Sequence, residues 1–455
     1  MNFLYIHTHD TGRLLSPYGY RVPTPNIENF AGDAAVFEQC YCAGPTCSPS
    51  RAAMLTGVYP HQNGMLGLAQ RGFSIDYSRH LVQWLNRHGY HTVLSGIQHE
   101  AGWYMNKEDA DPIGYCENLT HSDEGYRQEE LVKWDMENAR SAADWIRQYD
   151  GSKPFFLSYG MFATHRRFPD WVDESVNQNF MQPPVPLPNT PEVRLDMAQF
   201  ATSVKWADDC FGVVINALKE KGIYDDTVIM LTTDHGLSAP YCKCSLFDSG
   251  IGVAMILRKP GAASNGKAVN GMISHVDVYP TVCELLGIDT PDWLEGTSFA
   301  PMLEDSSRTI RDEIYSEVTF HTSYEPARCV RTGRYKYIRY FDTDWLKTNC
   351  SNCDESLTKD YYLTKGLRER PKSAEALYDM VYDTGERNNL IDDPACREIA
   401  DTLRRKLQEH MERTNDPLLA GPIAVRPEWK VNRKECMQAS SKNPDDYVSL
   451  GRKKS

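Results

Sequence analysis

The chain has 455 residues, of which 41% are hydrophobic and 24% are charged. This composition is typical of a folded globular protein and excludes a disordered, collagen-like or coiled-coil chain. The 49 basic and 62 acidic residues give a formal charge of −13, which argues against a nucleic-acid partner because such binders usually carry a basic face. A local cationic site for a small anion is compatible with that charge. At roughly 150 residues per domain, the length allows up to about three domains.

Membrane, secretion and disulfide signals are all weak in this sequence. No run reaches the ~18 apolar residues that a membrane span needs, and the apolar run at 2–6 is too short for a secretory signal. The 13 cysteines are odd in number and scattered, which is not typical of a disulfide framework. We therefore predict a cytoplasmic protein with no membrane partner. Cys350 and Cys353 form an isolated CxxC pair, for which a polar loop with free thiols is favoured over a zinc site.

Short apolar runs alternate with helical patterns over residues 1–305. The pattern at 79–89 has helical spacing and ends at a glycine, as helices commonly do. A second, longer amphipathic pattern predicts a helix over 195–221. Strands are predicted at 3–8, 91–95, 154–161, 227–232 and 253–257. Strands that alternate with helices predict an α/β domain with a mostly parallel sheet.

The pattern changes after about residue 305. Residues 331–341 alternate in the manner of a strand, residues 376–382 follow, and a helix is predicted from about 394 to 413. We predict a smaller α+β subdomain with an antiparallel sheet at 306–426. The polar, basic stretch 427–455 is predicted to be a loose tail or arm.

Reactive side chains follow the carboxyl ends of several predicted strands. Ligands of open α/β sheets bind outside those ends, so two Asp/His pairs could converge on one divalent metal ion. Histidine and aspartate together suit Zn, Mn or Fe, whereas Ca and Mg prefer oxygen ligands. A single histidine near a strand end is more often a structural hydrogen-bonding group, and only the two pairs together make a metal site as plausible as that interpretation. The residues are His9, Asp10, His99, His165, Asp234 and His235.

The strongest local signal is the segment 45–57, which reads PTCSPSRAAMLTG. Pro49 suits the first position of a helix, which would make Ser48 the N-cap. Cys47 would then lie at a helix N-terminus, where the helix dipole favours an anion and Arg51 adds a positive charge. A thiol in that place is expected to be acidified and nucleophilic. An ordinary capped helix with a buried cysteine is the alternative.

The CSPSR motif at 47–51, followed by LTG at 55–57, resembles the signature of the type I sulfatases in the alkaline-phosphatase superfamily. The resemblance runs over nearly the whole chain, and the matching segments lie at 24–27, 56–61, 233–236, 243–250, 277–281 and 377–390. The segments 61–65 and 185–190 most resemble the heparan N-sulfatase (sulfamidase) branch. The resemblance implies a large mixed, mostly parallel sheet flanked by helices as the catalytic domain at 1–305.

The resemblance also implies the chemistry. A maturation enzyme would convert Cys47 to formylglycine, whose hydrate attacks sulfur with one hydroxyl and expels sulfate with the other. The substrate would be a small sulfated molecule, and a sulfated sugar such as glucosamine is expected. One divalent ion (Ca, Mn or Zn) would act as a Lewis acid, held by His9, Asp10, Asp234 and His235. Arg51 would hold the aldehyde hydrate, His99 would hydrogen-bond it, and the residues that grip sulfate and assist the leaving group would be His165 and Lys243. A homo-oligomer is left open.

Two positions depart from the family pattern. His9 stands where the family has a carboxylate, and a nitrogen ligand there favours Mn or Zn over the usual calcium. The alternative is that His9 does not bind the metal and that Asp10 is the only ligand from the first strand. The family lysine in Gly-Lys-x-His is replaced by Ile97, and the candidates for supplying its charge are Arg13, Lys243 and Arg166. A phosphodiester or phosphonate monoester hydrolase and a non-catalytic anion- or glycan-binding relative are therefore the alternative functions.

Overall fold

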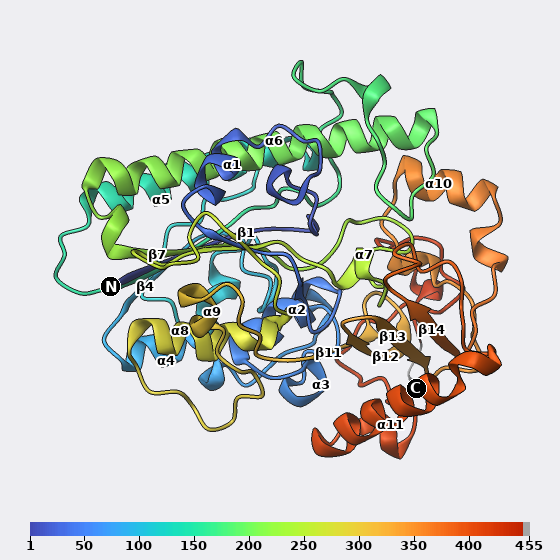
Figure 1. The fold of residues 1–455 in the computed structure, drawn as a ribbon. Coiled ribbons are helices and arrows are strands. Elements are labelled where there is room, and N and C mark those ends of the chain that lie inside the picture. The colour runs from blue at the N-terminus through green and yellow to red at the C-terminus, as the bar shows by residue number, and fades with distance from the viewer. Residues whose placement is uncertain (449–455) are drawn as a thin grey trace, which may run out of the picture.

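The computed structural model describes residues 1–448. Its centre is an eight-stranded sheet with the strand order β5-β4-β6-β1-β7-β8-β2-β9 (Figure 1). The central strands are β1 (Asn2–Thr8), β4 (His91–Gly96), β6 (Phe155–Gly160) and β7 (Thr227–Thr233). They pair in parallel, β1 with both β6 and β7 and β4 with β6. The predicted α/β class is confirmed, and so is the mostly parallel sheet.

The sheet is mixed because of its outer strands. β8 (Met255–Arg258) runs antiparallel to both β7 and β2 (Ala35–Phe37). The two edge strands are short, β5 at Glu117–Asn118 and β9 at Ala268–Val269. A separate two-stranded sheet joins β3 (Cys40–Tyr41) to β10 (Ile273–Ser274).

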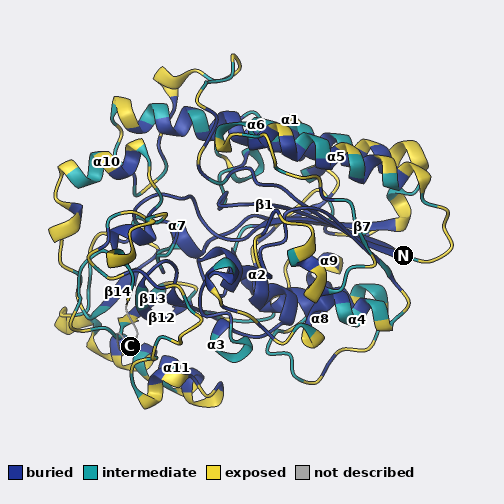
Figure 2. Cartoon of the chain, turned by 180° about the vertical axis from the view of Figure 1, so that it is seen from behind, coloured by how far each residue is buried: buried dark blue, intermediate teal, exposed yellow. Residues whose placement is uncertain are grey.

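Helices cover both faces of the large sheet, which explains why β1 is buried along its whole length. Leu4 and Ile6 point to the face covered by α1 (Pro25–Ala31), α5 (Leu131–Gln148) and α6 (Pro191–Lys221). Phe3 and Tyr5 point to the opposite face, where Figure 1 shows α2 (Cys47–Thr56), α4 (Leu81–Arg87), α8 (Val278–Leu286) and α9 (Ala300–Glu304). In Figure 2 the strands are buried and the exposed residues lie on the outer sides of the helices.

Helix α6 begins one turn earlier than the sequence predicts. Pro191 occupies the start of the helix, and the Thr190 side chain caps it by accepting a hydrogen bond from the backbone N–H of Val193. The pattern that predicts a helix from Leu195 does not include Val193, although Val193 is buried in this first turn.

The C-terminal part contains a four-stranded antiparallel sheet in the order β11-β12-β13-β14. The strands are β11 (Glu313–Phe320), β12 (Tyr324–Thr332), β13 (Tyr335–Tyr340) and β14 (Glu375–Asp379), and the amphipathic helix α11 (Arg397–Arg413) packs on them. The short helices α3 (Pro60–Asn63), α7 (Asp248–Ile251) and α10 (Leu357–Thr364) complete the chain. The predicted strand at 331–341 is confirmed by β13 over Tyr335–Tyr340, but its predicted start is wrong, because a tight turn at Gly333 and Arg334 separates β12 from β13.

The segment 427–448 is packed against the body of the protein, so the prediction of a loose tail is wrong for this stretch. The Arg71 guanidinium donates to the carbonyl oxygens of Lys430 (3.0 Å) and Ala439 (2.7 Å). Val431 is buried, and the backbone N–H of Asn432 donates to Thr322 O. The basic end at 452–455 lies outside the described residues. The boundaries at 305 and 426 stay a prediction.

All 13 cysteines are free, as expected from their scattered spacing. Cys350 and Cys353 are both free, as predicted, and they are buried at a short 3-10 turn. Within residues 1–448, none of the helices has both the length and the apolar character required to traverse a bilayer.

Candidate active site

The carboxyl ends of β1 and β7 meet beside the N-terminus of α2. The parallel register pairs Thr8 with Thr233, so the residues that follow each strand lie next to one another. The backbone N–H of Asp10 donates to Asp234 Oδ1 at 2.8 Å. Asp10 has a φ of 58°, in the left-handed region that a residue with a side chain adopts at a cost in free energy. The chain therefore holds a strained backbone to direct this carboxylate.

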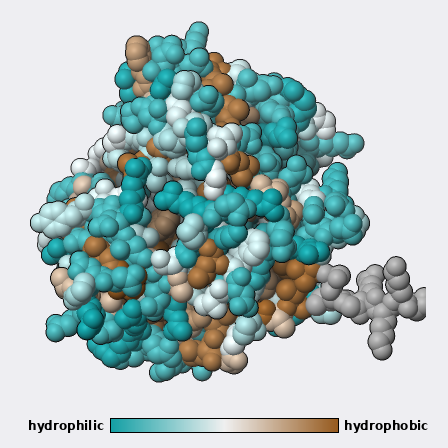
Figure 3. Space-filling model, turned by 90° about the vertical axis from the view of Figure 1, so that its right-hand side faces the viewer, coloured by the Kyte–Doolittle hydropathy of each residue, from teal (hydrophilic) through white to brown (hydrophobic). Residues whose placement is uncertain are grey.

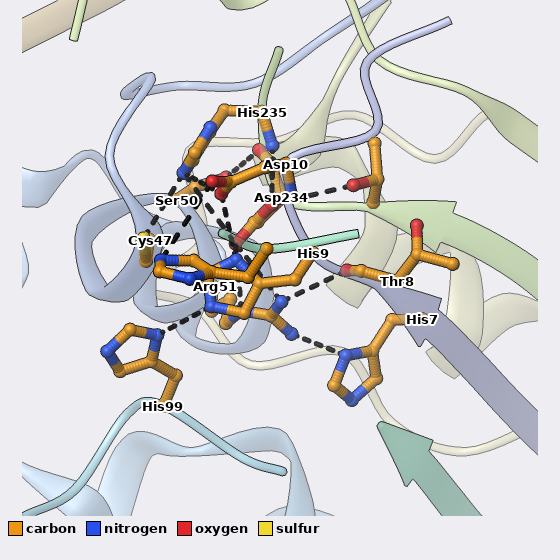
Figure 4. Close-up of polar contacts among 12 residues, drawn as sticks. His7, Thr8, His9, Asp10, Cys47, Ser50, Arg51, His99, Asp234 and His235 are labelled. Atoms are coloured by element: carbon orange, nitrogen blue, oxygen red, sulfur yellow. Dashed lines mark hydrogen bonds and ion pairs between the residues drawn. The ribbon is translucent and has the colours of Figure 1, made fainter. Parts of the chain in front are cut away.

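Five buried donor groups converge at this point, and their ligand atoms all lie within 4.8 Å of one another: His9, Asp10, Cys47, Asp234 and His235 (Figure 4). His9 Nδ1 is 2.8 Å from Asp10 Oδ1 and 3.2 Å from Asp234 Oδ2. His235 Nε2 is 3.3 Å from Asp10 Oδ1. His9 Nδ1 therefore faces both carboxylates directly.

The protonation states in this cluster favour cation binding. Burial raises the pKa of Asp234, but His235, His9 and Arg51 outweigh burial and hold this pKa well below its usual range. The pKa of Asp10 is also held low, mainly by Lys243 acting against burial. Burial lowers the pKa of His9 to about 3. A neutral imidazole beside two ionised carboxylates is a donor set that a divalent ion can use.

Cys47 is the first residue of α2, and its N-cap is Thr46. The expected position at the helix N-terminus is confirmed, but the predicted N-cap at Ser48 is wrong, because Pro49 is the third helical residue. The expectation of an acidified thiol is also wrong. Burial raises the pKa of the Cys47 thiol well above its ordinary value, and this outweighs the lowering effect of Lys243. The unmodified thiol is therefore a poor nucleophile.

Arg51 lies one turn into α2 and is fully buried. Its Nε and Nη2 atoms are 3.2 and 3.0 Å from Asp234 Oδ2, and Nη2 also donates to Thr8 O. Its Nη1 contacts His7 Nδ1. Arg51 therefore fixes the orientation of Asp234, while His7 supports Arg51 and stays outside the donor cluster.

The remaining predicted residues border the cluster. Lys243 Nζ donates to Asp10 Oδ2 at 2.9 Å and lies 3.3 Å from His165 Nε2. His99 Nδ1 is 3.1 Å from His9 Nε2. The structure thus brings together all nine residues that the sequence singled out, from segments spread between positions 9 and 243.

Asp354 is a site residue that the sequence did not reveal. Its Oδ2 accepts hydrogen bonds from Lys243 Nζ at 3.0 Å and from Ser238 Oγ at 2.5 Å. Burial raises the pKa of Asp354, but Lys243 and His165 outweigh burial and keep it low. Asp354 follows a short 3-10 turn in the C-terminal part, and no motif or strand end marks it in the sequence.

The position of the absent family lysine is filled by a hydrophobic side chain. Ile97 is fully buried in a cluster with Tyr104 and Phe162. Two of the three residues that could supply the charge of the absent lysine are bound to other groups. Arg13 donates to Cys40 O, and Arg166 forms a bidentate pair with Asp196 at 2.6 and 2.7 Å. Lys243 is the candidate that reaches the site.

Comparisons with known proteins agree with this geometry. The family model described as Sulfatase matches residues 1–288, and the model described as N-sulphoglucosamine sulphohydrolase, C-terminal, matches 234–347. Human N-sulphoglucosamine sulphohydrolase is 25% identical, with 89% of this chain and 88% of that protein aligned. A Δ4,5-hexuronate-2-O-sulfatase from Bacteroides thetaiotaomicron is 24% identical, with 91% and 89% aligned.

A solved structure with D-glucosamine-2-N,6-O-disulfate as its bound substrate has the same fold. Its TM-score is 0.68 at 17% identity, and the alignment covers 92% of this chain and 99% of that one. The Sulfatase model spans more than half of the chain. The strand-end donors, the helix that begins at Cys47 and this family match lead to one conclusion: the chain belongs to the sulfatase family and is a sulfuric ester hydrolase.

Proposed function

We propose that the protein hydrolyses a sulfate ester or sulfamate on a sulfated sugar, with residue 47 acting as formylglycine. The observation that carries the proposal is the position of Cys47, at the first residue of a helix and beside the strand-end donors. Burial that suppresses a thiolate is no obstacle to formylglycine, because an aldehyde hydrate does not depend on a low thiol pKa. The hydrate would supply the nucleophilic hydroxyl and the group that later expels sulfate.

One divalent ion is part of this proposal. His9, Asp10, Asp234 and His235 would hold it, and the fit rests on two ionised carboxylates and two imidazoles with converging ligand atoms. When bound, the ion would act as a Lewis acid toward sulfate oxygens. The mixed nitrogen and oxygen set favours Mn or Zn over Ca.

The chain's own groups have separable roles in the proposal. Lys243 is held between Asp10 and Asp354, and its pKa is raised well above the ordinary value because the two carboxylates outweigh burial. It would therefore stay protonated and donate hydrogen bonds to the sulfate group. His165 lies next to Lys243 and is partly exposed, and it would pass a proton to the departing oxygen or nitrogen. Arg51 and His99 would keep Asp234 and His9 in place.

The choice of a sulfated sugar is supported by the relatives. The C-terminal family model that matches 234–347 is named for N-sulphoglucosamine, and this stretch contains Lys243. The human relative carries the same name. N-sulfated glucosamine is therefore the first substrate to test. A formylglycine-generating enzyme is the expected maturation partner, and the cytoplasmic location stays a prediction.

The test has two parts. Peptide mass spectrometry of the 47-containing segment should find formylglycine in protein produced with a maturation enzyme. The modified protein should then hydrolyse N- or O-sulfated glucosamine with a higher kcat/KM than a phosphate diester or a phosphonate monoester. A higher kcat/KM on the phosphorus substrates would favour the alternative hydrolase, and absence of turnover by fully modified protein would favour the non-catalytic relative.

A further inference from the structure

A cavity of about 540 Å³ lies between α10, β14 and the segment that follows β7. A smaller cavity of about 80 Å³ adjoins it, shares its lining residues Tyr241, Phe247 and Tyr340, and reaches Lys243. Figure 3 shows the side of the molecule that carries α10 and the C-terminal sheet, where hydrophobic side chains are visible in a hollow between hydrophilic rims. The larger volume lies in the range of about 300–1,000 Å³ that small-molecule sites have.

Aromatic rings form the walls of the larger cavity. Tyr241 packs against Tyr362 with ring centroids 5.5 Å apart, and Phe247 packs against Tyr378 at 5.7 Å. The Tyr362 hydroxyl donates to Pro186 O at 3.2 Å. The hydroxyls of the other three lining tyrosines have no hydrogen-bond partner within residues 1–448, namely Tyr241, Tyr340 and Tyr378. These walls offer flat apolar faces together with free hydroxyl groups.

The charge of the lining is positive, although the whole chain carries −13. Within the described part of the chain, neither Arg370 nor Arg387 has a carboxylate within ion-pair distance, and Arg387 Nη2 contacts only Pro186 O at 3.3 Å. The lining acid Glu386 is neutralised by Lys336, whose Nζ is 2.8 Å away. The lining cation Lys372 is paired with Glu325. Two uncompensated guanidinium groups therefore face this cavity.

We propose that this cavity is a second binding site, for a sulfated or carboxylated sugar unit of a glycan. Guanidinium groups bind oxyanions through paired N–H donors, tyrosine faces pack against the apolar faces of a sugar ring, and their hydroxyls reach its hydroxyl groups. Cys47 is not among the residues that line this cavity, so the proposed site would bind a unit other than the one that is hydrolysed. The choice of a saccharide ligand rests on the proposed function, while the requirement for an anion rests on the charges alone.

The experiment measures binding without turnover. A Cys47→Ala protein is titrated calorimetrically with a sulfated heparin tetrasaccharide at physiological salt. Adding Arg370→Ala and Arg387→Ala should weaken binding at least tenfold or abolish one of two binding events. The matched control is Arg368→Ala with Arg397→Ala, which removes the same charge from exposed arginines that do not line the cavity, and it should leave the affinity within twofold of the parent.

A second variant tests the walls without changing charge. Tyr340→Phe with Tyr378→Phe removes only the free hydroxyls and should weaken binding by about threefold or more, the effect of at least one lost hydrogen bond. Unchanged affinity in the arginine variant, or an equal loss in its control, would overturn the proposal. Full-strength binding of the desulfated tetrasaccharide would also overturn it. The binding experiment does not depend on turnover. If the modified protein shows no sulfatase activity, the proposed function is refuted. If the arginine variant still binds the tetrasaccharide more weakly, this site is supported all the same.

Discussion

Lys243 Nζ lies 3.0 Å from Asp354 Oδ2, and the two residues are 111 positions apart in the sequence. Lys243 follows the sheet strand β7, whereas Asp354 belongs to the C-terminal part. The contact places a carboxylate from the C-terminal part beside the proposed sulfate-binding cation. The active site is therefore completed by residues beyond the match of the Sulfatase family model, which ends at residue 288.

We predict that Asp354→Asn lowers kcat/KM on sulfated glucosamine by about tenfold or more, because an amide keeps an acceptor for Lys243 but loses the charge-assisted hydrogen bond. The measurement is steady-state kinetics on modified protein, with metal content checked in parallel. Glu355→Gln is the matched control, since Glu355 pairs with Lys359 and not with Lys243. Equal losses in both variants would show that Asp354 has no specific role.

The identity of residue 9 should set the metal preference. We predict that His9→Asp shifts the bound ion toward calcium, because it replaces a nitrogen donor with a second oxygen donor on the same strand end. Elemental analysis after dialysis against equal Ca, Mn and Zn compares the variant with the parent. An unchanged metal ratio would mean that His9 is not a ligand.

The unmodified thiol of Cys47 should react slowly. Protein made without a maturation enzyme should alkylate at Cys47 at least about tenfold more slowly than at the exposed Cys116 near neutral pH, because burial raises the pKa of the Cys47 thiol. Time-resolved peptide mass spectrometry with iodoacetamide measures both rates in one sample. Faster labelling of Cys47 than of Cys116 would contradict the raised pKa.

Stability should fall in mild acid because several histidines are buried in the neutral form. His80 caps α4 by accepting a hydrogen bond from Val82 N–H, and burial lowers its pKa from 6.5 to about 3. The unfolded chain takes up a proton at about pH 6.5 and the folded chain does not, so this contribution is present above pH 6.5 and is lost as pH falls toward 3.

We predict that His80→Asn, which keeps a capping acceptor, reduces the pH dependence of the unfolding free energy by about 1.4 kcal/mol per pH unit in this window. Urea unfolding at a series of pH values gives the slope. His121→Asn, at an exposed histidine, is the control, and it should leave the slope unchanged. A His80→Asn slope equal to that of the parent would refute the assignment.

The parts of the site that follow strands could be predicted from the sequence. Parallel strands end at one edge of a sheet, so Asp10 and Asp234 were expected to meet, and they do. Asp354 could not be predicted, because only tertiary packing brings its segment to Lys243. The predicted N-cap of α2 was wrong by two residues, since proline is tolerated throughout the first turn, where backbone N–H groups have no partner within the helix.

The direction of the pKa shift of the Cys47 thiol could not be predicted from the sequence either. The helix N-terminus and Arg51 both favour a thiolate, but the complete burial of this residue outweighs them. Likewise, the alternation of residues 331–341 continues through the two-residue turn between β12 and β13. The sequence pattern therefore gives no sign of this turn. In both cases the deciding quantity is the packing around a residue, which a local pattern does not report.

The most direct measurement compares two preparations of the same chain, one expressed with and one without a formylglycine-generating enzyme. Mass spectrometry fixes the fraction of residue 47 converted in each, and kcat/KM is measured on N-sulfated glucosamine with metal supplied. The account predicts that activity rises in proportion to the converted fraction and vanishes when Cys47 is replaced by alanine. Activity that is equal in the two preparations, or that survives Cys47→Ala, would contradict it.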